Sequence, residues 1–213
     1  MQWQSLSLFA TPVIKIQIPG YLQARDFFFE RINQQVDAAK VRKEHNHITH
    51  YFSESNVFKA FPELAWLSDE LEKAGTFAYC ELLNYRKSRD LKLTNAWFNL
   101  CDVGGVQNRH SHANCRLSGT LYLNTDDNTR IRFMHPLSTS SMHTEIYDQP
   151  SEDDNPYGLG FHFPFVDVAV QAGDCLFWPS QLHHGYDTNK TPNRLSLSFN
   201  LMPQHMNTIY QIV

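Results

Sequence analysis

Apolar and polar residues alternate most strictly near the end of the sequence, from Arg194 to Leu201. Successive residues of a strand point to opposite faces, so this pattern predicts a strand with one apolar and one polar face. The apolar face carries Leu195, Leu197, Phe199 and Leu201, and the polar face carries Arg194, Ser196, Ser198 and Asn200. A polar face that begins with an arginine is unusual in a core strand. It is typical of a strand that lines a polar pocket in which an anion sits.

Shorter apolar runs separated by turn signals fill the chain from Leu93 onward. One run follows Gly173 and ends at Pro179. Another, from Leu117 to Leu123, is predicted to be a strand that brings Tyr122 toward the same interior. Short strands bounded by turns in this way are typical of a β-sandwich or barrel.

The first part of the chain predicts a strand followed by helices. Ser7 to Ile18 is predicted to be the strand, and Tyr21 to Lys40 has helical spacing of its apolar residues. Phe61 to Lys87 is the longest predicted helix, with a break near Gly75, whereas Val41 to Ser55 is predicted to be a loop. The fold class is therefore an all-β core with flanking helices, an α+β arrangement in which the N-terminal helices buttress one sheet.

Composition places the chain among ordinary globular proteins. Its 213 residues suit one domain with a sizeable core, and 42% of them are hydrophobic and 19% charged. The net charge of −4 argues against a protein that grips nucleic-acid backbone, which needs a basic surface. The sequence shows no basic and apolar leader and no apolar run of membrane-spanning length. Four scattered cysteines without a C-x-x-C pair are expected to be reduced thiols, so we expect a cytoplasmic protein.

Histidines provide the first candidate chemistry. His110 and His112 are two residues apart, so on an extended segment they project from the same side. Imidazole is the commonest protein ligand for divalent iron, copper, nickel and zinc. A third histidine from a distant strand, either His183 or its neighbour His184, would complete a metal site in the mouth of a barrel. Taken alone, the first pair is more often a hydrogen-bonded surface pair than a metal site.

Arg194 is the second candidate. It could pair with Asp174 or Asp187 at the surface. Its place on the polar face of the last strand instead favours a carboxylate ligand, because the planar guanidinium holds a carboxylate with two parallel hydrogen bonds.

Four motifs occur in a fixed order along the chain. They are His110-Ser-His112, Ser118-Gly-Thr-Leu-Tyr122-Leu, Trp178-Pro-Ser-Gln-Leu-His-His184 and Arg194-Leu-Ser-Leu-Ser-Phe-Asn200. Together they resemble the iron(II)/2-oxoglutarate-dependent oxygenases, and more narrowly a family of such oxygenases found in bacteria and phages. The segments from Leu8 to Val13 and from Ala96 to Leu100 also resemble that family, so the likeness spans most of the chain. Trp178 and Gln181 stand where the family usually has Phe and Trp.

This resemblance implies a double-stranded β-helix, a cupin-like jelly roll buttressed by the N-terminal helices. It implies an iron- and 2-oxoglutarate-dependent dioxygenase that hydroxylates a C–H bond of a peptide side chain or small metabolite, consuming O2 and releasing succinate and CO2. It also implies site residues: His110, His112 and His184 for Fe(II), and Arg194, Ser196 and Tyr122 for 2-oxoglutarate.

One domain over residues 1–213 is expected, with the N-terminal strand and supporting helices in 1–92 and the jelly-roll core in 93–213. Neither nucleic acid nor a membrane is expected as a partner, and a homodimer is left open. Two other functions are weighed. A cupin-like histidine–metal enzyme without 2-oxoglutarate leaves Arg194 and Ser196 without a role. A non-catalytic jelly-roll binding module would carry three inward histidines as an unneeded desolvation cost.

The wider superfamily has an H-x-D motif, and this chain lacks its aspartate. The residue two after His110 is His112, and the residue two after His112 is Asn114. We predict a three-histidine site. The alternatives are an Asn114 amide oxygen as the third ligand, or a vacant position where a halide could bind, as in halogenases that lack this aspartate.

Two polar stretches stand apart from these motifs. Ser138 to Gly158 is too long for an idle loop and is predicted to be either a lid over the barrel mouth or a mobile hairpin tip. His45, His47 and His50 could form a second metal site or part of a substrate pocket. Without a distant fourth ligand, a solvated loop is favoured for them.

Overall fold

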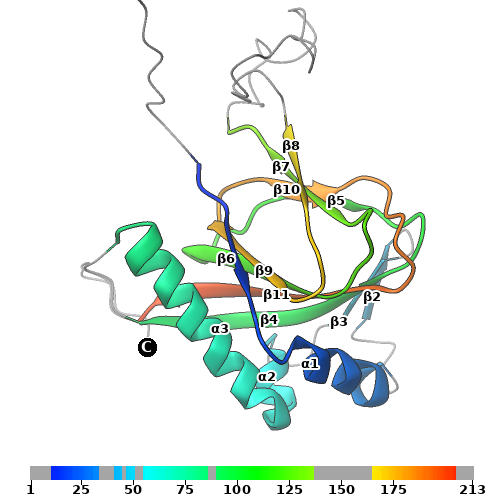
Figure 1. The fold of residues 1–213 in the computed structure, drawn as a ribbon, viewed down its shortest axis with the longest axis horizontal. Coiled ribbons are helices and arrows are strands. Elements are labelled where there is room, and N and C mark those ends of the chain that lie inside the picture. The colour runs from blue at the N-terminus through cyan, green and yellow to red at the C-terminus, as the bar shows by residue number, and fades with distance from the viewer. Residues whose placement is uncertain are drawn as a thin grey trace, which may run out of the picture.

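Two antiparallel sheets face each other in this protein, and helices cover the outer face of the larger sheet (Figure 1). The computed structural model describes residues 11–33, 41–44, 47–50, 55–85, 90–136 and 165–204. The larger sheet has the strand order β1-β9-β6-β11-β4-β3-β2 and the smaller sheet the order β5-β10-β7-β8.

The bounds of the strands are as follows. The larger sheet contains β1 (Ile14–Gln17), β2 (Val41–Glu44), β3 (His47–His50), β4 (Leu91–Cys101), β6 (Leu117–Asn124), β9 (Asp174–Pro179) and β11 (Arg194–Pro203). The smaller sheet contains β5 (Gln107–His110), β7 (Arg130–Met134), β8 (Phe165–Ala169) and β10 (His184–Tyr186). The chain changes sheet at each step from β4 to β7, pairs β7 with β8, and changes sheet again at each step from β8 to β11. This path is a double-stranded β-helix, as expected from the sequence.

The helices precede the β-helix in the chain and pack below its larger sheet (Figure 1). They are α1 (Tyr21–Phe27), α2 (Val57–Ala60) and α3 (Ala65–Phe77), with the short π- or 3₁₀-helical turns η1 (Phe28–Ile32), η2 (Pro62–Leu64) and η3 (Ala78–Leu82). The Asn56 side chain caps α2 by accepting a hydrogen bond of 3.0 Å from the Phe58 amide. Among the described helices, none is long and apolar enough to cross a membrane.

The main hydrophobic core lies between the larger sheet and these helices. The predicted apolar face of β11, formed by Leu195, Leu197, Phe199 and Leu201, is fully buried there. A second, smaller cluster lies on the opposite face of the sheet, between the two sheets, and includes Tyr122, Phe133, Leu176, Trp178 and Leu182. The alternation predicted for β11 is therefore confirmed, and its polar face points between the sheets.

The predicted helix break near Gly75 is wrong. Helix α3 runs through this residue and continues into η3. A Cβ atom at Gly75 would lie 2.4 Å from Leu201 Cδ1, so glycine here allows the helix to lie close against the sheet. Glycine inside a helical pattern often marks the end of the helix, whereas Gly75 serves close packing between the helix and the sheet.

The predicted loop from Val41 to Ser55 is also wrong in part, because β2 and β3 fall within it. Strand β3 pairs with β4, from His47 opposite Cys101 to His50 opposite Phe98. Pairing with a distant strand overrides the local polarity of the segment. In the first helical region, α1 and η1 reach Ile32, and residues 34–40 lie outside the described residues. The opening strand is shorter than predicted in the part the structure describes, because β1 begins at Ile14.

Candidate metal centre

Three histidines meet at one end of the space between the sheets. His184 begins β10 and lies opposite His110 at the end of β5, and His112 follows in the loop before β6. One potential ligand atom from each residue lies within 4.8 Å of the others. The ring centroids are 4.4 Å apart for His110 and His184, 5.3 Å for His110 and His112, and 5.1 Å for His112 and His184. The predicted cluster is therefore formed, with His184 rather than His183.

Each ring directs its Nδ1 toward an oxygen acceptor. His110 Nδ1 lies 2.8 Å from the Asn108 carbonyl, and His184 Nδ1 lies 2.9 Å from the Leu182 carbonyl. His112 Nδ1 lies 2.6 Å from Asn200 Oδ1. Because these oxygens only accept, Nδ1 is the protonated nitrogen in each ring. In the neutral tautomer, Nε2 then carries the lone pair that a metal requires.

Burial keeps two of the three histidines neutral. It lowers the pKa of His184 to about 3, and the neighbouring His110 acts in the same direction. Burial also lowers the pKa of His112, although the hydrogen bond to Asn200 acts against the shift. Both side chains are therefore unprotonated at neutral pH, which is the state that binds metal.

The orientation of His112 is fixed by residues that the sequence analysis did not select. Asn200 is only 5% exposed, and its Oδ1 accepts from both the His112 ring and the Cys115 thiol, the latter at 3.2 Å. Ser118 Oγ lies 3.1 Å from His112 Nδ1. Asn200 lies on the polar face of β11. The alternation of polar and apolar residues in this strand is the sequence signal that could have identified Asn200 as a residue of the site.

Further into the barrel, the same polar face forms a chain of hydrogen bonds. Ser198 Oγ accepts from the Asn99 amide at 3.0 Å and lies 3.0 Å from Thr120 Oγ1. These residues come from β11, β4 and β6, which are neighbours in the larger sheet. The interior therefore has a polar floor that runs from the histidines toward Arg194.

Arg194 is buried at the far end of this floor, with only 4% of its surface exposed. The guanidinium carbon lies 3.8 Å from the centre of the Tyr186 ring and 5.6 Å from that of Tyr122. Its Nη2 donates to the Arg130 carbonyl at 3.2 Å. Tyr186 was not predicted, because only the fold places β10 beside this end of β11.

No carboxylate among the described residues forms an ion pair with Arg194. Asp174 instead contacts Lys15 and Gln17, and Asp187 contacts Arg132. The surface pairings considered for Arg194 are therefore not formed.

The tyrosines beside Arg194 do not compensate its charge either. Burial raises the pKa of Tyr122 to about 12, although Arg194 acts against this shift, and burial also raises the pKa of Tyr186. Both phenols stay uncharged at neutral pH. A buried guanidinium in these surroundings forms a site for an anion.

Trp178 adds an unusual donor to the same interior. The side chain is 1% exposed, and its ring centroid lies 4.7 Å from that of His184 and 5.2 Å from that of Phe133. Its indole Nε1 is buried and has no hydrogen-bond partner among the described residues. A buried donor of this kind usually has a partner, so this N–H is available to an acceptor atom of a bound group.

The remaining predicted residues divide into three groups. Ser196 and Tyr122 are buried and lie opposite each other on neighbouring strands, as expected for one pocket. His183 and Asn114 are exposed. The segment Ser138–Gly158, predicted as a lid or a hairpin tip, lies outside the described residues, and so does His45. His47 and His50 lie on β3, of which only the backbone is described.

The fold and the site together define a class of protein. A double-stranded β-helix with three clustered imidazoles at one end of its interior and a buried arginine further along it is built as a metal-dependent enzyme. Residues 95–200 match the family described as "Putative 2OG-Fe(II) oxygenase". The comparison with curated proteins gave no match.

Solved structures share the fold at low sequence identity. HygX from Streptomyces hygroscopicus, with nickel, 2-oxoglutarate and hygromycin B bound, is 14% identical with a TM-score of 0.53, over 94% of this chain and 85% of that one. A Pseudomonas putida prolyl-4-hydroxylase is 14% identical with a TM-score of 0.52, over 92% and 94%. An oxidoreductase of the 2OG-Fe(II) oxygenase family from Burkholderia pseudomallei is 10% identical with a TM-score of 0.53, over 93% and 88%.

The chain belongs to the 2OG-Fe(II) oxygenase family, and its cofactors are Fe(II) and 2-oxoglutarate. The residues present fit both groups. Neutral imidazoles suit Fe(II), and the buried Arg194 charge suits a dicarboxylate. The indole N–H of Trp178, for which the described part of the chain provides no partner, offers a further donor in the same interior.

Proposed function

We propose that His110, His112 and His184 are the three protein ligands of the iron. The observation that carries this proposal is the orientation of the rings, since all three direct Nδ1 to an oxygen acceptor and cluster closely. Three neutral ligands leave the bound ion with its full positive charge, which favours an anionic chelator such as 2-oxoglutarate. The exposed Asn114 is not needed as a ligand.

We further propose that Arg194, Ser196 and Tyr122 hold the carboxylate of 2-oxoglutarate that is distant from the iron. Arg194 supplies the charge, and its contacts with the Tyr186 and Tyr122 rings fix the guanidinium in place. The uncharged Tyr122 phenol and the Ser196 hydroxyl add hydrogen-bond donors on neighbouring strands. Fixed donors in a dry interior bind an anion without further reorganisation.

When bound, iron and 2-oxoglutarate supply the activation of O2, with release of succinate and CO2. The residues of this chain provide orientation and shielding. Trp97, Trp178 and Phe133 surround the histidine rings and limit water access to them. The proposed reaction is hydroxylation of a C–H bond in a peptide side chain or small metabolite. A prolyl-4-hydroxylase and the hygromycin-bound HygX among the similar structures support both substrate classes.

Anaerobic titration of the Fe(II) protein with 2-oxoglutarate tests this function. We expect a visible metal-to-ligand charge-transfer band in the wild type. Arg194→Leu should weaken 2-oxoglutarate binding by about 2–5 kcal/mol, because a charge-assisted pair is lost and a carboxylate is left unpaired. Its iron content should stay normal, since the proposed iron ligands lie elsewhere.

Arg130→Leu is the matched control, because this neighbouring arginine is exposed and contacts Arg194 only through its backbone carbonyl. It should bind 2-oxoglutarate as the wild type does. Equal 2-oxoglutarate affinity in the wild type and Arg194→Leu would refute the assignment of Arg194. Absence of the band at saturating 2-oxoglutarate would favour a histidine–metal enzyme that does not use this cosubstrate.

A further inference from the structure

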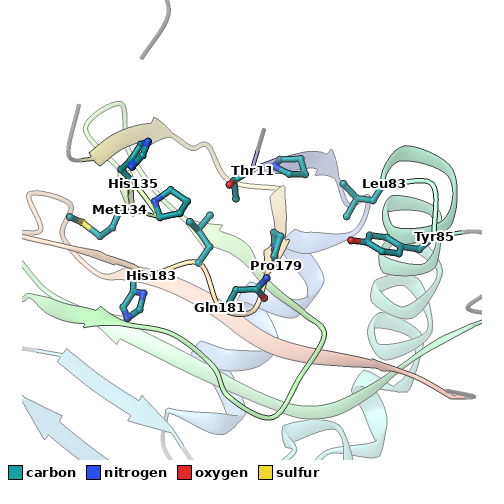
Figure 2. Close-up of a pocket in the computed structure, with 11 residues that line it drawn as sticks. Thr11, Leu83, Tyr85, Met134, His135, Pro179, Gln181 and His183 are labelled. Atoms are coloured by element: carbon teal, nitrogen blue, oxygen red, sulfur yellow. The ribbon is translucent and has the colours of Figure 1, made fainter. Parts of the chain in front are cut away.

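A cavity of about 610 Å³ lies beside the three-histidine cluster (Figure 2). One wall carries Leu83 and Tyr85, which follow η3, and the opposite wall carries His135 and His183 from the smaller sheet and its loops. Thr11 lies between these walls. This volume lies within the range of pockets that bind small molecules.

The cavity shares one loop with the metal centre. Residues 180–183 connect β9 with β10, and Pro179 at the end of β9 lines the cavity together with Gln181, Leu182 and His183. The backbone of this loop contacts the histidines: the Ser180 carbonyl accepts from the His112 amide at 2.9 Å, and the Leu182 carbonyl accepts from His184 Nδ1 at 2.9 Å. A molecule in the cavity would therefore rest on the segment that positions two of the three histidines.

The described lining of the cavity is rich in rings and lacks carboxylate, ammonium and guanidinium groups. Among the described residues that line it, none is Asp, Glu, Lys or Arg, and two are histidines, His135 and His183. Three prolines and the Tyr85 ring offer flat apolar surfaces, and Gln181, Thr11 and the Tyr85 hydroxyl offer hydrogen bonds. In Figure 2 the phenol oxygen of Tyr85 lies on the side of the ring that faces Pro179 and Gln181.

The Tyr85 ring is held in a fixed position. It stacks on Tyr79 with centroids 4.5 Å apart and planes at 9°, and the guanidinium carbon of Arg116 lies 4.9 Å from its centre. Arg116 Nε in turn donates to the Tyr79 hydroxyl at 3.0 Å. A ring that is already immobilised loses little side-chain entropy when a ligand stacks on it or bonds to its hydroxyl.

We propose that this cavity binds an uncharged, ring-bearing part of a small-molecule substrate, beside the metal centre rather than at it. The inference rests on the proposed function, because it assumes that a substrate is oxidised at the histidine site. A charged group would lose its hydration there, and none of the described residues that line the cavity is an Asp, Glu, Lys or Arg that could pair with it. Binding of a remote, unreactive group supplies energy for placing the reactive carbon near the metal.

Three probes of the same shape and different charge test the proposal: benzamide, benzoate and benzamidine. Binding to the full-length protein is measured by ligand-observed NMR titration. We expect benzamide to bind at least about tenfold more tightly than either charged probe, which corresponds to about 1.4 kcal/mol. Tyr85→Ala and Gln181→Ala should each weaken benzamide binding several-fold, whereas Leu22→Ala, at an exposed apolar position on α1, should not.

Two results would overturn the proposal: tight binding of a charged probe, or benzamide binding that both cavity variants leave unchanged. Failure of all three probes to bind at millimolar concentration would also count against it. The 2-oxoglutarate titration is repeated on Tyr85→Ala, which should give the wild-type result. If the wild type does not bind 2-oxoglutarate, the proposed function fails. If the wild type binds 2-oxoglutarate but the probe results are negative, only the cavity assignment fails.

Discussion

At the scale of single residues, the His112 ring depends on a partner far away in the chain. Asn200 accepts its Nδ1–H at 2.6 Å and is itself held by the Cys115 thiol. A hydrogen bond to the rear nitrogen of a metal-binding imidazole fixes both the tautomer and the ring plane. Asn200 is therefore a positioning residue for the proposed iron site.

Asn200→Ala should weaken iron binding by about 10–100-fold, the usual effect of removing such a partner. Asn200→Asp keeps an acceptor oxygen and should retain most of the affinity. Iron affinity is measured by competition with a chelator, and Ser198→Ala is the control, because Ser198 lies on the same face but bonds to Asn99 and Thr120. Unchanged iron affinity in Asn200→Ala would show that the hydrogen bond is dispensable.

The three-histidine site makes a separate prediction about ligand identity. His110→Ala, His112→Ala and His184→Ala should each lose most of the bound iron, because two remaining protein ligands hold Fe(II) poorly. Asn114→Ala should keep its iron, since Asn114 is exposed and is not a proposed ligand. Metal analysis of the purified variants measures this. Full iron content in any of the histidine variants would refute the assignment.

At the scale of elements, the sequence predicts best those properties that depend on one strand alone, such as which of its faces is buried. The alternation in β11 correctly predicted both its buried face and its polar face, because the period of a strand is a local property. The contacts of Asn200 with His112 and of Arg194 with Tyr186 depend on register and on which strands are neighbours. Those are set by the whole fold, so local pattern could not supply them. Strands β3 and β2, at one end of the larger sheet, are missed from the sequence for the same reason.

Gly119 shows how closely two neighbouring strands depend on each other. It lies opposite Phe199, whose ring covers it, so that a Cβ atom would lie 2.4 Å from the ring and 3.1 Å from the Leu176 carbonyl. Gly119→Ala should therefore destabilise the protein by about 1–3 kcal/mol, the usual cost of overpacking a core. Denaturant unfolding measures this change.

A smaller residue at position 199 provides the matched test. In the background of Phe199→Leu, Gly119→Ala should cost clearly less, because the clashing ring has been removed. Equal costs in both backgrounds would mean that the ring is not the cause.

At the scale of the whole molecule, the N-terminal region and the β-helix share one core. Strand β1 pairs with β9, and the residues of α1, α2 and α3 pack in the same cluster as the apolar face of β11. We therefore propose that residues 1–92 and 93–213 form one domain and unfold in a single transition.

This transition should depend on pH in the metal-free protein. The folded His184 has a pKa of about 3, below its usual value of 6.5. Above pH 6.5 the residue is neutral in both states and has no effect. As the pH falls from about 6.5 toward 3, the unfolded chain binds a proton that the folded protein does not. His184 alone should lower the free energy of unfolding by at most about 1.4 kcal/mol per pH unit over this range. The lowered pKa of His112 adds a further decrease in the same direction.

Denaturant unfolding of the metal-free protein at several pH values between 7 and 4 measures this slope. His184→Gln should reduce it, whereas His183→Gln, at the exposed neighbouring position, should leave it unchanged. The same slope in His184→Gln would show that other groups cause the acid sensitivity.

The position of β11 has a consequence for synthesis of the chain. It lies between β4 and β6 at the centre of the larger sheet, yet it is the last strand in the described part of the sequence. While the ribosome is still translating, β4 and β6 cannot be joined, and each keeps one edge of unpaired backbone groups. Such edges can pair with other chains, so the newly made polypeptide passes through a stage in which it is exposed to aggregation. That stage ends only when the residues up to Pro203 have left the ribosomal tunnel, and the strand that closes the sheet then also brings Arg194 and Asn200 to the proposed site.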